Sequence, residues 1–483
     1  MRFPILTLPL FCLAACTAGP DYQGPAAAGA TPPPGRFARA VPDAGTEAPA
    51  VAAWWKALGD PVLDGLEEQA LAANPDIAIA RARVRQARAS VRSERANAAP
   101  KANASALYLH ATVPGVNLGN SEDSGASDGD SGDSDSQSLN FYNLGFDASW
   151  EVDLWGGKRR GVEAARAQLD AAEANTADAQ VGLTAEVAQA YVNLRDRQQR
   201  LVLARDAAGR QRELLTLTAQ RRTQGTASEL DVEQQRDRLE QSEAALLPLE
   251  AERDAYLNAL ATLVGQAPGT LDTTLAVPAA VPLPPAQVAI GDPAALLQRR
   301  PDVRAAERQY AAATAKIGVA QAARFPSLSF MGLIGIGGTH PEDMFDPGNL
   351  AAIAVPRLSW SFLDFGRNAA NVERARGTQD EAAAQYRGSV LKALQDCEDA
   401  LSRYGAQRQT AQSAGRSLAT ADRSAKLVRQ RFDAGVATRI QLLDAERQTI
   451  AAAQSVSQAN AAMTADFIAL QKALGLGWQP VER

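Results

Sequence analysis

RQRFDAGVATRIQLLDAERQ, residues Arg429–Gln448, is the segment that decides the fold. A helical pattern runs up to Gly435 and resumes at Thr438. This predicts two helices joined by a very tight turn, because glycine readily adopts the left-handed conformation that ends a helix. AQRRTQGTASELDVEQQRDR at 219–238 has the same pattern, with Gly225 lying 210 positions before Gly435 and a helix restarting at Ser228. The sequence therefore predicts a duplicated structure.

Further landmarks recur in both copies. Those that precede the acidic loop of the first copy lie 226 positions before their equivalents, and those that follow the loop lie 210 positions before theirs. The matching pairs are Pro75-Asp76 with Pro301-Asp302, Pro100 with Pro326, Trp150 with Trp360, and Gly156 with Gly366. An acidic Ser/Gly segment, SEDSGASDGDSGDSDSQS at 121–138, accounts for the longer loop of the first copy. Such a segment cannot bury apolar surface, so we expect a solvated, mobile loop. A calcium site is the alternative, although the glycine and terminal glutamate of an EF-hand are not at their positions.

Composition limits the class of protein. The chain has 483 residues, of which 46% are apolar and only 5% aromatic, and its net charge is −6. Abundant alanine favours long, closely packed helices. No basic stripe with interleaved aromatics is found, so nucleic acid is excluded as a partner.

The N-terminus, MRFPILTLPLFCLAAC, has the layout of a secretory signal, residues 1–15, and is too short to span a membrane. Leu13-Ala14-Ala15-Cys16 resembles the lipobox of bacterial lipoproteins, which implies a covalent lipid on Cys16 as the first mature residue. The alternative is an ordinary signal peptide with an incidental cysteine. Thr17 stands where an inner-membrane retention signal usually has Asp, so the resemblance implies the outer membrane. Residues 16–50 are rich in Pro, Ala and Gly and predict a tether.

Each copy then has two strand-like runs, at about 102–155 and 327–364. In LNFYNLGFDASWEVDLW, apolar and polar residues alternate from Tyr142 to Leu154. This alternation is long enough for a tilted strand of a membrane barrel, with one face on lipid and one on water. A half-buried strand of a soluble sheet alternates in the same way; the signal peptide favours the barrel. SLSFMGLIGIGG at 327–338 and AAIAVPRLSWSFLDFG at 351–366 form the weaker second copy.

Long proline-free helices follow each strand pair. The helix predicted over 157–223 has about 67 residues and a length of about 100 Å, and the shorter helices over 75–99 and 226–264 together match it. The second copy repeats this with a long helix over 366–434. The predicted organisation is a first repeat at 51–265, a Pro-rich linker at 266–290, a second repeat at 291–475 and a tail at 476–483. The fold class is mixed, all-α plus membrane β.

Four strands cannot close around a lumen, yet an open edge would leave backbone groups unpaired in hydrocarbon. The chain must therefore assemble. Two copies give 8 strands, which side chains just fill, so an open conduit favours three or more copies.

Four segments together carry a family resemblance: WWKALGDPVLDGLEEQALAANPDI, SWEVDLWGG, SWSFLDFGR and RFDAGVATRIQLLDAE. They resemble the TolC-like outer-membrane factors, in the NodT-type efflux lipoprotein subclass. The resemblance implies a homotrimer with a 12-stranded barrel in the outer membrane of a Gram-negative bacterium, continuing into a periplasmic helical barrel. It also implies a periplasmic adaptor protein and an inner-membrane RND-type pump as partners. The implied function is an exit duct for drugs or other small molecules.

In that family the tight helical turns converge at a periplasmic tip and constrict the pore. The matching positions here are Asp231, Gln441 and Asp444, and Phe432 matches an aromatic position of the family gate. Arg439 lies near them, and Gly225 and Gly435 are the turn glycines. Rings of aspartate around a threefold axis would attract cations. The alternative is capping, since Ser228-x-x-Asp231 and Thr438-x-x-Gln441 both have the pattern of a capping box, whereas Asp444 lies beyond it. Gln441 departs from the commonest acidic pattern, and Arg439 reduces the charge of the ring.

No catalytic constellation emerges from the sequence. His110 and His340 lack metal-ligand spacing, and GGKRR at 156–160 lacks the other residues of a phosphate-binding loop. Cys397 lies in an apolar stripe and is predicted to be a packed residue. Two other functions remain open at this stage: a channel for type I protein secretion, and a structural periplasmic coiled coil that has no pore.

Overall fold

The computed structural model describes residues 17–24, 37–40, 49–114 and 136–479. Contacts divide the described chain into two compact units. The strand unit contains 17–24, 87–114, 136–168 and 310–381, and the helical unit contains 37–40, 49–86, 169–309 and 382–479. Most of the acidic segment at 121–138 lies outside the described residues. Cys16 also lies outside them.

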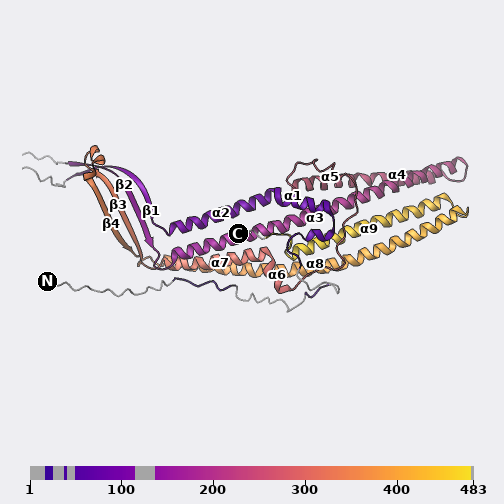
Figure 1. Ribbon diagram of the computed structural model, residues 1–483. Coiled ribbons are helices and arrows are strands. Elements are labelled where there is room, and N and C mark those ends of the chain that lie inside the picture. Colours follow the sequence, from indigo (N-terminus) through magenta and orange to yellow (C-terminus); the bar gives the residue numbers. More distant parts are fainter. Residues whose placement is uncertain (1–16, 25–36, 41–48, 115–135, 480–483) are drawn as a thin grey trace, which may run out of the picture. The chain divides into compact units, whose positions relative to one another are not determined.

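The strand unit is built on one antiparallel sheet, seen in Figure 1 as four neighbouring arrows. Its strands are β1 (Lys101–Pro114), β2 (Ser136–Val152), β3 (Ser327–Gly338) and β4 (Leu350–Ser359), in the order β1-β2-β3-β4. The 3-10 turns η2 (Pro341–Phe345) and η3 (Pro347–Asn349) connect β3 to β4. The two strand pairs therefore join through β2 and β3, with Phe146 opposite Ile334 and Trp150 opposite Phe330.

Strand register sorts the side chains by face, because alternate residues of a strand point to opposite faces. One face has a row that is apolar on all four strands, from Ala104 on β1 through Phe146 and Ile334 to Ala352 on β4, while His110 and Asn140 lie further along the same face. The opposite face of β1 and β2 carries polar groups, including Asn103, which donates a 2.9 Å hydrogen bond to Asp147 across the strands. The alternation predicted for 142–154 is thus present on β2. On β3 and β4 both faces carry apolar side chains, as in the pairs Ile334–Ala352 and Leu333–Ile353.

Matching tryptophans join the strands to the helices that precede them. The indole N–H of Trp150 donates to the carbonyl of Ala98, just after α2, and that of Trp360 donates to the carbonyl of Arg324, just after α7, both at 3.1 Å. These carbonyls belong to the ends of helices, where intrahelical partners run out. The same polar contact therefore fixes the strand-to-helix corner in both repeats.

The other regular elements of the described chain are helices. The first repeat has η1 (Trp54–Leu58), α1 (Pro61–Ala73), α2 (Pro75–Asn97), α3 (Gly157–Thr223), α4 (Glu229–Ala244) and α5 (Leu246–Leu263). The second has α6 (Pro293–Arg299), α7 (Pro301–Ala322), α8 (Arg367–Asp433) and α9 (Arg439–Ala473). The long helices α3 and α8 each have 67 residues. The bounds predicted for the first, 157–223, are confirmed, and α8 begins and ends one residue inside the predicted 366–434.

Two expectations need correction. The helix predicted over 226–264 is divided at Ala245 into α4 and α5, because Pro248 has no N–H to donate to the carbonyl of Ala244. The segment expected to be a tether is packed where it is described. Phe37 is buried in the main core, and the backbone N–H groups of Ala38 and Arg39 donate to the Glu398 carboxylate.

The main core lies in the helical unit. It collects Trp54, Trp55, Leu63, Tyr191 and Phe467, among others, from η1, α1, α3 and α9. Trp54 packs edge-on against Phe467, with ring centroids 6.0 Å apart. The Tyr191 hydroxyl donates a 2.6 Å hydrogen bond to Asp60, the N-cap of α1. The short helices are thus bound to the long ones through apolar and polar contacts together.

Glu67 is an anomaly in this core. Its side chain is 0% exposed, and neither carboxylate oxygen has a hydrogen-bond partner. Burial, and secondarily the charge of Asp64 one turn earlier, raise the pKa of Glu67 well above its usual value. A carboxyl group in this environment prefers the protonated form. In the unfolded chain it ionises near pH 4.3, so folding costs more free energy as the pH rises above that point.

We therefore predict that Glu67→Leu raises the thermal denaturation midpoint at pH 8, because leaving such a group unpaired costs about 1–3 kcal/mol. Glu67→Gln should flatten the fall of the midpoint between pH 5 and pH 8, since it cannot ionise. Circular dichroism of the helices measures both effects. Glu68→Gln, at the exposed neighbouring position, is the control. If the midpoint of Glu67→Gln fell with pH as steeply as that of the wild type, the raised pKa of Glu67 would be contradicted.

Candidate functional site

The two helical turns have the same backbone geometry. At Gly435 (φ 73°) the N–H of Val436 donates to Arg431 O at 2.8 Å, and the N–H of Gly435 donates to Phe432 O at 2.9 Å. At Gly225 (φ 71°) the corresponding bonds are 2.8 and 2.9 Å. This is the Schellman arrangement, which needs a residue with positive φ at the end of the helix. Both predicted turns and their glycines are confirmed.

A capping box starts the helix after each turn. The Ser228 hydroxyl accepts from the Asp231 N–H, and the Asp231 carboxylate accepts from the Ser228 N–H at 2.8 Å. Thr438 and Gln441 repeat this reciprocal pair at the start of α9. Hydrogen bonds from Ser228 hold the pKa of Asp231 below its usual value, so this exposed carboxylate is charged at neutral pH. Capping is therefore one role of both residues.

The other candidate gate residues lie close to the second turn. Asp444 is exposed and forms a 3.2 Å ion pair with Arg447 in its own helix. Phe432 is half-buried, three residues before Gly435. Asp444 is thus free of the cap, as the spacing predicts.

Arg439 makes a contact that the sequence did not predict. Its guanidinium donates two hydrogen bonds to the Glu213 carboxylate, at 2.7 and 3.1 Å. Glu213 belongs to α3, so this bidentate pair joins the α3–α4 hairpin to the α8–α9 hairpin (Figure 1). The pairing lowers the pKa of Glu213 and raises that of Arg439. Bidentate geometry is the strongest form of such a contact.

A second ion pair joins the same hairpins. Arg210 of α3 lies 2.9 Å from Glu446 of α9, and Arg429 of α8 also binds Glu446. Arg210, Glu213 and Glu446 could not be identified from the sequence, because no pattern within one hairpin fixes its register against the other. The tip therefore consists of two capped turns held together by charges.

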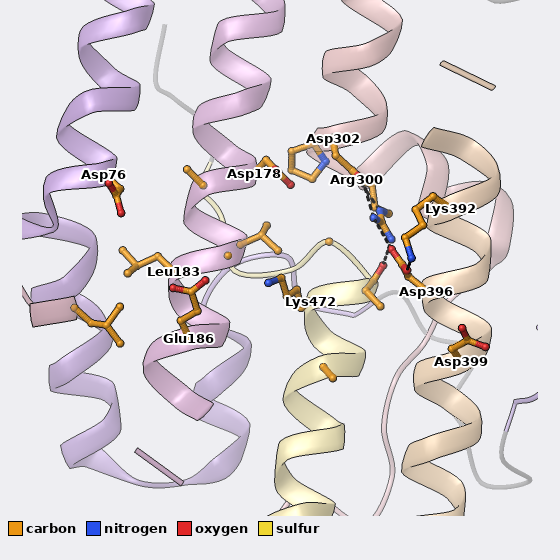
Figure 2. A pocket seen from close by; sticks show the side chains of 18 of the residues that line it. Asp76, Asp178, Leu183, Glu186, Arg300, Asp302, Lys392, Asp396, Asp399 and Lys472 are labelled. Carbon is orange, nitrogen blue, oxygen red and sulfur yellow. Dashed lines mark hydrogen bonds and ion pairs between the residues drawn. The ribbon is translucent and has the colours of Figure 1, made fainter. Parts of the chain in front are cut away.

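A charged pocket lies where the short helices meet, and Figure 2 shows it between α2, α3, α8 and α9. Its volume is about 720 Å³. Arg300, at one wall, binds Asp302 at 2.7 Å, Asp396 at 3.4 Å and the carbonyl of Ala473 at 3.0 Å. Asn74, its equivalent in the first repeat, likewise donates to the carbonyl of Leu263 at 2.9 Å. The polar side chain before each Pro-Asp thus closes the corner of its own repeat.

The cysteine, the two histidines and the GGKRR turn that were considered for catalysis or metal binding have packing or turn roles in the fold. Cys397 is fully buried, and burial raises the pKa of its thiol to about 12, so it is a packed residue as predicted. His110 lies on β1, where its Nδ1 atom is 2.7 Å from Oδ1 of Asn140 on β2. His340 precedes the turn η2. Gly156 directly precedes α3, in which the N–H groups of Lys158 and Arg159 donate to the Asp153 carboxylate.

The sheet presents apolar side chains to the surroundings of the single chain. Phe146 is 62% exposed and Leu358 70% exposed. Among the described residues, β1 pairs with β2 alone and β4 with β3 alone, so both outer edges are unpaired. No described helix is both long and apolar enough to cross a membrane.

Comparison with known protein families shows which family the chain belongs to. Residues 66–266 and 293–476 match the family described as "Outer membrane efflux protein". The chain belongs to the outer membrane efflux protein family. The two matched segments correspond to the two repeats, and the gap between them falls in the Pro-rich linker.

Relatives of this efflux protein cover nearly all of its length. It is 32% identical to the pyoverdine export outer membrane protein OpmQ of Pseudomonas aeruginosa, over 88% of this chain and 87% of that protein. It is 30% identical to the outer membrane protein OprJ of the same species, over 96% and 94%. Nodulation protein T of Rhizobium leguminosarum is 29% identical over 100% and 99%.

Solved structures of outer-membrane channels have the same fold as this chain. The outer-membrane channel OprN superposes with a TM-score of 0.85 and 34% identity, covering 96% of this chain and all of that one. The open state of the MtrE outer membrane channel of Neisseria gonorrhoeae gives a TM-score of 0.77 and 26% identity, over 96% and 99%. The predicted fold, a TolC-like duplicated repeat, is confirmed. The efflux protein is an outer-membrane channel.

Proposed function

We propose that the chain works as a homotrimer whose four-stranded sheets close into one 12-stranded barrel. The observation that carries this is a sheet with one apolar face and two unpaired edges. In hydrocarbon the edges must pair, and β4 of one copy against β1 of the next would pair them. Three sheets would leave a lumen, with the polar face of β1 and β2 lining it.

The trimer would serve as the exit duct of a tripartite efflux system. An inner-membrane RND-type pump would supply the energy and a periplasmic adaptor would dock to the helical end. The chain would have no catalytic activity of its own. Small molecules are favoured over secreted proteins as cargo, because relatives are named for export of pyoverdine and for efflux of toluene and solvents. The non-pore coiled coil does not account for the apolar sheet.

The helical tip would be the gate of this duct. Opening requires the two hairpins to separate, and the pairs Arg439–Glu213 and Arg210–Glu446 oppose that separation. Each pair is partly exposed, so its contribution is screened and weakened by salt. Asp231 and Asp444, repeated around a threefold axis, would add the charge that favours cations.

We predict that Glu213→Gln raises the conductance of the purified protein in planar lipid bilayers severalfold, because Arg439 then loses its charged partner on the other hairpin. The double variant Asp231→Ala/Asp444→Ala should also raise the conductance if these residues guard the pore, whereas a pure cap would leave it unchanged. Glu233→Gln is the control, since Glu233 pairs with Arg236 within one helix. Equal conductances in wild type and Glu213→Gln would refute the proposed role of the Arg439–Glu213 pair in holding the two hairpins together.

We also propose that Cys16 carries a covalent lipid that anchors the N-terminus in the outer membrane. The support is the lipobox-like segment Leu13-Ala14-Ala15-Cys16. The barrel would hold the trimer in the membrane independently of the lipid.

Cys16→Ala should accordingly remove the lipid, seen as a loss of mass in the N-terminal peptide, while trimers still form in detergent. The measurement is mass spectrometry together with size-exclusion chromatography and light scattering. A Cys16→Ala protein that was soluble and monomeric would contradict the barrel.

A further inference from the structure

The joint between β2 and α3, residues 150–156, is covered within the chain, and we call it joint 1. The ring of Trp155 stacks on that of Phe325, with centroids 4.6 Å apart, and its indole N–H donates to the carbonyl of Pro326 at 2.7 Å. The N–H of Ala18 donates to the Trp155 carbonyl at 2.9 Å. Phe325 and Pro326 lie in the corner between α7 and β3. The second repeat therefore covers the joint of the first.

The equivalent joint between β4 and α8, residues 360–366, is exposed, and we call it joint 2. Phe365 stands 210 positions after Trp155 and is 93% exposed. Phe362 and Leu363 beside it are 77% and 68% exposed. Large apolar side chains gathered in this way on one short segment are typical of a surface that binds a partner.

The backbone of Phe365 is in the left-handed region, with φ of +51°. A phenylalanine is rarely found there, because its Cβ crowds the backbone, and such a conformation persists where surrounding contacts hold it. The single chain supplies few contacts to a residue that is 93% exposed. The strain and the exposure of Phe365 together indicate a contact that another molecule supplies.

The α7–β3 corner has an equivalent between α2 and β1. The carbonyls of Arg324 and Ala98, 226 positions apart, accept the indole N–H of the tryptophan of their own repeat in the same way. By the same separation, residues 325–326 of the first-described corner correspond to Ala99 and Pro100. Ala99 and Pro100 are both exposed in the single chain. The first repeat therefore has a corner like the one that covers joint 1, with its apolar surface uncovered.

The α2–β1 corner and joint 2 lie at opposite edges of the sheet. β1 and β4 are the outer strands, as Figure 1 shows, and β2 and β3 separate them. Within the chain, the antiparallel pairing of β2 with β3 sets Val152, at the end of β2, opposite Leu328, near the start of β3. That pairing brings joint 1 to the α7–β3 corner. If β4 pairs in the same manner with β1 of another copy, joint 2 comes to the α2–β1 corner of that copy.

We propose that joint 2 binds the α2–β1 corner of a second copy of this chain, with the ring of Phe365 seated on Ala99 and Pro100. This rests on the homotrimer proposed above and names side chains outside the strands that would complete it. Trp155 needs an acceptor for its indole N–H, whereas the ring of Phe365 has no polar group and needs only an apolar surface. Each copy would contribute one joint and one corner, so that the contacts close into a ring after three copies.

The test is photo-crosslinking in the full-length protein in native membranes. Phe365 is replaced by p-benzoylphenylalanine. As the control, Phe345 of η2, which is 77% exposed at the other end of β3 and β4, is replaced in the same way. Crosslinked products are separated on denaturing gels, and their tryptic peptides are analysed by mass spectrometry. We expect dimers and trimers in which the peptide that contains position 365 is joined to peptide 96–101, and no such product from position 345.

Substitutions on both sides of the contact measure its effect on the assembly. Phe365→Ala should lower the temperature at which trimers dissociate in detergent by several degrees, because an apolar contact is lost, whereas Phe345→Ala should leave it unchanged. Ala99→Glu should also lower this temperature, since it places a charge under the ring. The double variant Phe365→Ala/Ala99→Glu should show less than the sum of the two effects, because both changes remove the same contact. Circular dichroism checks that each variant is folded.

Three results would count against the proposal. Trimers in which position 365 is joined to lipid or to its own chain, and never to peptide 96–101, would overturn the contact and leave the proposed homotrimer in place. Additive effects of Phe365→Ala and Ala99→Glu would show that the two residues do not touch. An absence of trimers in the unmodified protein would overturn the homotrimer and this inference together.

Discussion

In hydrocarbon every backbone N–H and C=O without a partner costs free energy, and β1 and β4 each present a whole row of such groups at an outer edge of the sheet. A single chain cannot satisfy them, because four strands are too few to close. The apolar face that runs from Ala104 to Ala352 is equally unsuited to water. Assembly in a membrane removes both problems together, and the duct follows from that assembly.

The duplication supplies the structure that this assembly needs. Trp150 and Trp360 fix the strand-to-helix corners, Asn74 and Arg300 close the helical corners, and Gly225 and Gly435 form the tips. The contacts that distinguish the two repeats are those to which a function is proposed. Arg439 of the second repeat binds Glu213 of the first, and Ala18 donates a backbone hydrogen bond to the carbonyl of Trp155 at the strand-to-helix joint of the first repeat.

Much of the fold could be predicted from the sequence because it depends on local chemistry. Proline-free periodicity gave the 67-residue helices, and glycine followed by a Ser or Thr cap gave the turns. Alternation gave the faces of β2. The hydrogen-bond partners of Asp231 and Gln441 were predictable for the same reason. Arg439–Glu213, Arg210–Glu446 and the burial of Glu67 could not be predicted, because each depends on which segments meet across more than a hundred residues.

The most direct test of the account is whether the free edges meet between copies. Ala104→Cys on β1 would be combined in turn with a cysteine at each position of β4, in a chain whose buried Cys397 is replaced by alanine. Oxidation in membranes should give covalent dimers and trimers at one register, and nothing larger. No intermolecular product at any register, or a ladder extending beyond three chains, would contradict the closed trimeric barrel.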